Sequence, residues 1–158
     1  MDQPVFPCIA VSLSGDMQAS PIEAFLKHRP NERWVLVGQH AVQSTDQLWT
    51  AWIQAARNEL RQAMVARSID AEFLRYLAGT HHISEAFARA GWQSGQTSAW
   101  ILFLCEAEGL ANDLGHLQPI SLPYEAFHEQ SQALLSTLKW AEVQSEVIHS
   151  IEGMSTLG

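Results

Sequence analysis

The residues with the most chemistry to offer are two adjacent histidines, His81 and His82, in the stretch LRYLAGTHHISEAFARAGW. Imidazole side chains can act as general acids or bases, ligate metal ions or form hydrogen bonds to an anion. Here they follow Gly79 and precede an amphipathic segment, residues 83–90, that is typical of a short helix ended by a glycine. Such a helix start directs free backbone N–H groups and the positive end of the helix dipole toward an approaching anion.

The common signatures of catalysis and metal binding are absent from the sequence, which has no G-x-S-x-G elbow, P-loop or G-x-G-x-x-G. Adjacent helix residues diverge by about 100°, so His81 and His82 cannot easily share one metal ion, and the other histidines lack ligand spacing. The two cysteines lie in apolar runs that favour buried, reduced thiols. We therefore predict no catalytic residue, no metal site and no cofactor. One alternative stays open: an enzyme with His81 or His82 as general acid or base, in a deep pocket and paired with Glu85 or Asp70.

The charge distribution limits the partners that the chain can bind. A net charge of −8 excludes a broad basic surface for nucleic acid. Residues 57–89, however, carry five arginines against four carboxylates, whereas residues 90–158 carry one lysine against eight. Phosphate contacts are therefore plausible near the histidines, where Arg67 and Arg75 could add donors. A second interpretation is equally open: Thr80 caps the helix, the histidines are solvated and Arg75 pairs with a carboxylate.

These side chains need a scaffold, and the hydropathy pattern predicts alternating strands and helices. We expect strands at residues 5–13, 34–38, 72–78 and 99–105, helices at 21–28, 45–64, 81–90, 124–138 and 141–151, and a loop at 106–123. The segment 72–78 also has helical spacing, but a strand is favoured because Gly79 and Thr80 separate it from the next helix.

The alternation indicates an α/β (α+β) fold, a single domain with a mixed central sheet packed against several helices. A chain of 158 residues that is 47% hydrophobic can fill one core. We expect the domain to cover residues 1–152 and residues 153–158 to form a frayed C-terminus. The sequence has no apolar run long enough to span a membrane and no features of a signal peptide, so we expect a cytoplasmic protein without a membrane partner.

Three stretches together resemble the kinase-binding subunit of the KEOPS tRNA-modification complex, the CGI-121 family. They are WVLVGQHAVQSTDQLWTAWIQAARNE, ARSIDAEFLRYLAGTHHISEAFARAGW and TSAWILFLC, within residues 34–105. The most specific matches are Arg67-Ser68, Glu72-Phe73-Leu74, Tyr76, Gly79, Ile83-Ser84-Glu85-Ala86 and Gly91. The C-terminal helices match the family only loosely.

The resemblance implies a non-catalytic subunit that binds the small atypical kinase/ATPase of KEOPS and, as in archaeal members, the single-stranded 3′ CCA end of tRNA. KEOPS installs a threonylcarbamoyl group on adenosine 37 of tRNAs that read codons beginning with A. By the same resemblance, the RNA-receiving surface would consist of Arg67, Arg75, Gly79, His81, His82 and Ile83. The kinase-docking face would include Val143, Val147, Ile148 and Ile151. A purely protein-binding adaptor without RNA contact is the other alternative, and it agrees with the acidic composition.

One departure from the family concerns the histidines, because family members usually carry Arg-Gln where this sequence has His81-His82. Histidine retains stacking and hydrogen bonding but is mostly neutral near pH 7, whereas arginine keeps its charge. We therefore expect few and local phosphate contacts. We also expect RNA binding to strengthen when the pH falls from about 8 to about 6.

Overall fold

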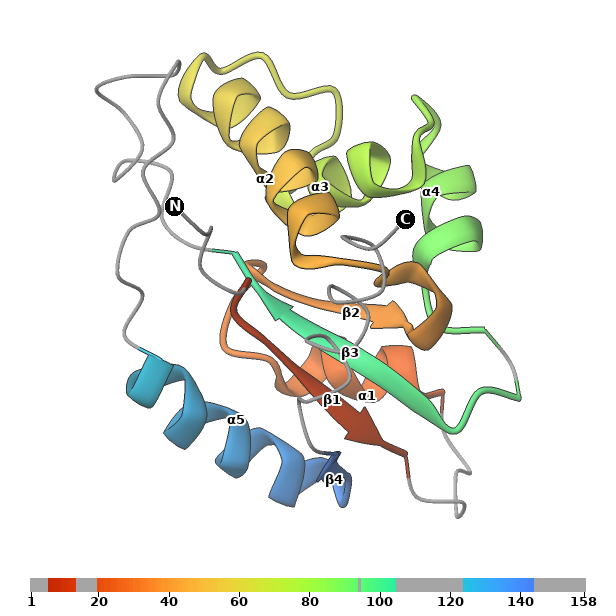
Figure 1. Cartoon of the computed structure of the whole chain (residues 1–158), viewed down its shortest axis with the longest axis vertical. Coiled ribbons are helices and arrows are strands. Elements are labelled where there is room, and N and C mark those ends of the chain that lie inside the picture. Colours follow the sequence, from red (N-terminus) through yellow and green to blue (C-terminus); the bar gives the residue numbers. More distant parts are fainter. Residues whose placement is uncertain (1–5, 14–19, 94, 105–123, 144–158) are drawn as a thin grey trace, which may run out of the picture.

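The centre of the computed structural model, which describes residues 6–13, 20–93, 95–104 and 124–143, is a four-stranded sheet in the order β2-β3-β1-β4 (Figure 1). The strands are β1 (Cys8–Ser12), β2 (Trp34–Gly38), β3 (Ser98–Phe103) and β4 (Ala141–Val143). In β3, Ile101 lies opposite Ile9 of β1 and Leu36 of β2. Every pairing among these strands is antiparallel, so the expected mixed sheet is wrong. The reason is that β3 inserts between β1 and β2, which run in the same direction but do not pair.

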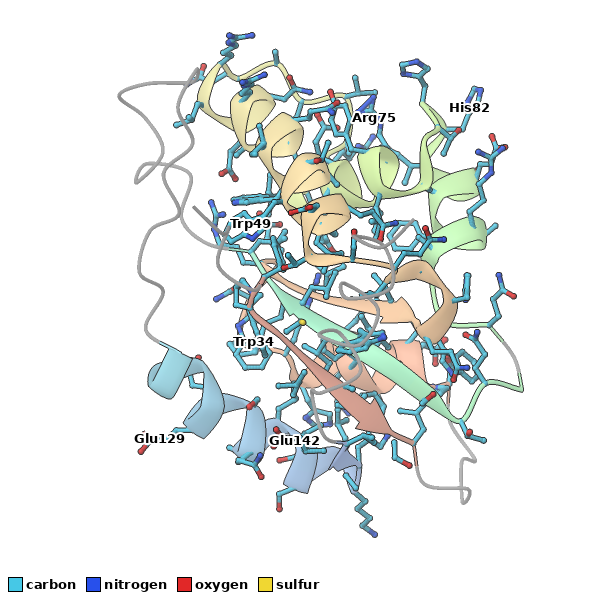
Figure 2. The ribbon with its side chains drawn as sticks, in the orientation of Figure 1. Trp34, Trp49, Arg75, His82, Glu129 and Glu142 are labelled. Atoms are coloured by element: carbon cyan, nitrogen blue, oxygen red, sulfur yellow. The ribbon has the colours of Figure 1, made fainter. Side chains whose placement is uncertain are left out.

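Both faces of the sheet are covered by helices, because successive strand residues point to opposite faces. Val35 and Val37 enter the core on one face, and Trp34 and Leu36 enter the core on the other. The helices on the first face are α2 (Thr45–Leu60), α3 (Ile69–Ala78) and α4 (Ile83–Ala90), and those on the second are α1 (Pro21–His28) and α5 (Tyr124–Leu138). Figure 2 shows Trp49 and Trp34 on opposite sides of the sheet. The three layers confirm the predicted α+β domain.

The helix ends follow local signals, with one difference in α2. The bounds of α1 and α5 are those predicted. Ser44 caps α2 as expected, and its Oγ accepts a backbone N–H 3.1 Å away. The helix ends at Leu60 and not at residue 64, because Gln62 takes the left-handed conformation (φ 54°). The Ala63 N–H then bonds to the Asn58 carbonyl at 2.9 Å, which closes the last turn.

The expected strand at residues 72–78 is wrong, since these residues form most of α3. Phe73 and Leu74 pack into the core beneath the helix. Glu72 pairs with Arg75 three residues later, a spacing that brings side chains together on a helix and onto opposite faces of a strand. Gly79 is therefore the C-cap of a helix and not a break between a strand and a helix.

The C-terminal part contains a second correction at residues 141–143. These residues form β4, not the start of a helix, because Lys139 takes a left-handed conformation (φ 58°) and turns the chain back along the free edge of β1. The expected loop 106–123, Cys105 and the rest of the expected helix, 144–151, lie outside the described residues. Within the described part of the chain, no helix has both the length and the apolar character needed to cross a membrane.

Candidate functional site

The two histidines lie in the short connection between α3 and α4. Gly79 is left-handed (φ 70°), and the Thr80 N–H bonds to the Arg75 carbonyl at 3.0 Å. Because α4 begins at Ile83, the histidines precede its first turn. Both imidazoles are exposed, whereas Ile83 is half-buried. The connection therefore presents two imidazole side chains in front of a helix N-terminus.

Thr80 fixes the start of α4 through its hydroxyl group. Its Oγ1 accepts a hydrogen bond from the His82 N–H (3.2 Å) and donates one to Glu85 Oε2 (3.0 Å). Glu85 also pairs with Arg89 on the next turn. The N-cap residue of α4 is His82, whose side chain makes no capping hydrogen bond, so Thr80 does not cap the helix but holds the backbone of His82 and the side chain of Glu85 together. Within the described residues Glu85 is thus engaged by Thr80 and Arg89 and not by a histidine.

A buried carboxylate, Glu72, connects three segments behind the histidines. Its side chain is completely withdrawn from solvent, and it accepts hydrogen bonds from Asn58 of α2 (3.0 Å) and from Arg75 (2.7 Å). It also accepts from the backbone N–H groups of Val65 and Ala66 (3.2 and 3.1 Å) in the loop between α2 and α3. Burial alone would raise the pKa of Glu72, but these hydrogen bonds outweigh it and hold the pKa below its ordinary value.

Arg75 is buried as well, with 3% of its surface exposed. Its Nη1 donates to Glu72 and its Nη2 donates to Nδ1 of His81 at 3.4 Å, whereas its buried Nε has no hydrogen-bond partner among the described residues. The guanidinium carbon lies 5.3 Å from the centre of the Tyr76 ring. The pairing of Arg75 with a carboxylate, one of the two interpretations left open above, is therefore present. Arg75 is itself buried, but it contacts the exposed side chain of His81.

The loop between α2 and α3, which is tied to α3 by the hydrogen bonds to Glu72, carries further exposed side chains. Arg67 is exposed, and the described residues include no carboxylate paired with it. Val65, two residues earlier, is 63% exposed. The sequence pattern did not single it out, because a lone apolar residue in a loop has no characteristic spacing. Figure 2 shows Arg75 and His82 at the end of the molecule opposite Glu129 and Glu142.

The predicted kinase-docking residues lie mostly outside the described part of the chain. Val143 is 39% exposed on β4, at the edge of the sheet. Val147, Ile148 and Ile151 lie beyond residue 143, outside the described residues.

The surroundings of the histidines offer little for catalysis. Among the described residues, no three His, Cys, Asp or Glu side chains gather as metal ligands. Asp70 accepts a hydrogen bond from Arg29 at 2.8 Å, so its carboxylate already has a partner other than a histidine. Burial raises the pKa of the Cys8 thiol to about 12, which disfavours the reactive thiolate. An open groove lies on the other side of the sheet, between α1 and α5, and is lined by His28, Pro30, Gln130, Ala133, Leu134 and Thr137. In the part of the chain that the structure describes, the connection is open and neither histidine pairs with a carboxylate, whereas the acid–base alternative expects a deep pocket with such a pair.

Comparison with known proteins identifies one family. A family model described as kinase-binding protein CGI-121 matches residues 17–145, which is most of the chain. The matched region contains every described element from α1 to β4, including the connection with the two histidines. No curated protein matches the chain.

Proposed function

The chain belongs to the CGI-121 family of kinase-binding proteins, and from that membership we propose that it is a non-catalytic subunit of the KEOPS complex. In this function it binds the small atypical kinase/ATPase of that complex and the 3′ CCA end of tRNA, and so supports threonylcarbamoylation of adenosine 37. The observation that supports RNA capture is the exposure of His81 and His82 just before the first turn of α4, with Arg67 exposed in the loop that binds Glu72 through its backbone.

These groups suit an unpaired RNA end. An unstacked base can lie on an imidazole or a guanidinium, and its edge and phosphate accept N–H donors. Arg67 supplies a permanent charge, and the two histidines supply hydrogen bonds and stacking faces. Gly79 borders open space, since nothing lies within 4 Å of where a Cβ would be. A nucleotide can therefore approach the backbone closely at this position.

The kinase would bind at a separate surface. The proposed docking residues are Val143, Val147, Ile148 and Ile151, at or beyond β4. Glu142, the neighbour of Val143 on β4, lies at the opposite end of the molecule from Arg75 and His82 (Figure 2). A subunit with two separate surfaces can hold the kinase and the tRNA at the same time.

Direct binding tests the RNA part of the proposal. The purified chain is titrated with one tRNA, intact and with its CCA end removed, at two salt concentrations. Intact tRNA should bind and trimmed tRNA should not. Equal affinity for both would contradict CCA capture. If neither tRNA binds, co-purification with the kinase tests the purely protein-binding adaptor.

A charge reversal with a matched control locates the surface. Arg67→Glu should weaken tRNA binding by about tenfold or more, because it replaces a phosphate contact with a repulsive charge. Lys139→Glu changes the net charge equally at an exposed position after α5, so it should have little effect. Both variants should still co-purify with the kinase. Equal losses of tRNA affinity would attribute the effect to net charge and remove Arg67 from the site.

A further inference from the structure

The contact between Arg75 and His81 determines which kind of group His81 can bind. A guanidinium carries only hydrogen-bond donors, so Nδ1 of His81 must be the acceptor in the 3.4 Å contact with Arg75 Nη2. A neutral imidazole with an accepting Nδ1 carries its proton on Nε2. The His81 side chain is exposed, and no described residue bonds its Nε2. His81 therefore presents an N–H donor to solvent.

Arg75 is well held for this role. It is buried, and Glu72 fixes its other nitrogen at 2.7 Å. Glu72 is itself fixed by Asn58 and by two backbone N–H groups. In many proteins a carboxylate accepts the Nδ1–H of a histidine and leaves Nε2 as the acceptor or ligand. At His81 the orienting group is a cation, so Nδ1 is the acceptor and Nε2 carries the proton.

The contact with Arg75 from α3 requires that Nδ1 of His81 carries no proton. The nearest carboxylate of α4, Glu85, is engaged by Thr80 and Arg89. A proton on Nδ1 would place an N–H against the guanidinium N–H and break the contact.

We propose that Arg75 is a positioning residue that acts through His81 and makes it a hydrogen-bond donor, so that this part of the surface selects an acceptor on the RNA end. The inference rests on the proposed RNA-binding function. The acceptor is either a phosphate oxygen or the ring nitrogen N3 of a cytosine. Arg75 itself does not touch the RNA.

The tautomer is measured without RNA, by ¹⁵N–¹H NMR of the imidazole side chains near neutral pH. The spectrum should show His81 protonated on Nε2 alone. In Arg75→Lys, which keeps a cation beside Glu72 but lacks the forked guanidinium, His81 should show a mixture of tautomers. A wild-type His81 protonated on Nδ1 would overturn the proposal. If the spectrum shows His81 protonated on Nε2 but the chain binds no RNA, the RNA-binding function is overturned and the Arg75–His81 contact is not.

Two substitutions of His81 test whether its Nε2–H group contributes to tRNA binding. Gln places an amide N–H where Nε2 stands, whereas the shorter Asn side chain places it near Nδ1. His81→Gln should bind intact tRNA within about twofold to threefold of wild type, and His81→Asn should lose about five- to tenfold, as expected for one hydrogen bond. Arg75→Lys should cost less affinity in the His81→Gln background than in wild type, because an amide needs no tautomer selection. Equal costs in both backgrounds would mark Arg75 as merely structural and overturn the proposal.

The RNA end distinguishes the two sources of the acceptor. Replacing both cytidines by uridines turns the N3 acceptor of each base into a donor and leaves the phosphates unchanged. If a base is bound, wild type should lose affinity and His81→Ala should not. If a phosphate is bound, the replacement should change neither. Tighter binding of the uridine-containing end by wild type, lost in His81→Ala, would show that His81 accepts and would contradict the proposal.

Discussion

Glu72 and Arg75 form an ion pair whose side chains are 0% and 4% exposed. Burying two charges costs desolvation energy that the attraction between them barely offsets, whereas removing one partner leaves an uncompensated charge. In this protein each oxygen of Glu72 accepts two hydrogen bonds, so the carboxylate is well satisfied. The pair links α2, the following loop and α3, so it stabilises the segments that carry Arg67 and Arg75.

Glu72→Gln should therefore destabilise the fold. The new amide nitrogen cannot accept hydrogen bonds, so two of the four donors lose their acceptor and Arg75 loses its counter-charge. We expect a loss of about 3–5 kcal/mol in the free energy of unfolding, measured by urea denaturation. Glu129→Gln, the same substitution at an exposed position on α5, should change it by less than about 0.5 kcal/mol. Similar losses in both variants would contradict a structural role for the buried carboxylate.

The pKa of Glu72 gives a pH dependence with a defined sign. Because the pKa is lower in the folded state than its ordinary value of 4.5, the unfolded chain binds this proton more readily. The stabilisation is therefore complete above the unfolded-state pKa and is lost as the pH falls below it and through the lower folded-state pKa. Urea midpoints measured across this range should decline, and the decline should be smaller in Glu72→Gln. An identical pH profile in the two proteins would show that other carboxylates cause the loss.

At the scale of the elements, the connection between α3 and α4 depends on the backbone of Gly79. Its φ of 70° is costly for residues with a Cβ, and the space around it is open. Gly79→Ala should lower the free energy of unfolding by about 1–2 kcal/mol for conformational reasons alone. Gly79→Asn should cost less, since asparagine adopts this conformation more readily. Thermal unfolding of both variants checks this, and equal costs would rule out the conformational explanation.

The elements that the sequence predicts well are those with local signals. The apolar runs of β2 and β3 and the proline at the start of α1 act within a few residues. The helix α3 is missed because its short apolar pattern also fits a strand and because glycine ends both kinds of element. The strand order depends on pairing between distant segments, such as β1 with β3.

For the candidate site, the sequence indicates exposed histidines but not the burial of Arg75. His81 and His82 are conspicuous by type and position, and both are exposed as expected. Arg75 is expected at the surface because arginine is rarely buried. The structure buries it, since a carboxylate three residues earlier on the same helix supplies the pairing that burial requires. Whether a given arginine finds such a partner depends on packing that local sequence patterns do not contain.

Across the described part of the molecule, local ion pairs neutralise part of the positive charge. The chain has nine Lys and Arg residues in total, and four arginines pair with carboxylates. The exposed arginines in the loop after α2 are Arg61 and Arg67. With a net charge of −8, the chain lacks a general attraction for RNA. Any binding must therefore come from a few local contacts.

The salt dependence of tRNA binding measures how many phosphates take part. Each phosphate of a single strand contributes a slope of about −0.7 to log K against log salt concentration. Contacts through Arg61 and Arg67 alone predict a slope between about −1 and −2, determined from affinities at several KCl concentrations. Arg67→Glu should make the slope shallower by about one contact, while the matched Lys139→Glu should leave it unchanged. A slope steeper than about −4 would require an extended basic groove, which the charge pairing in the described part of the chain does not provide.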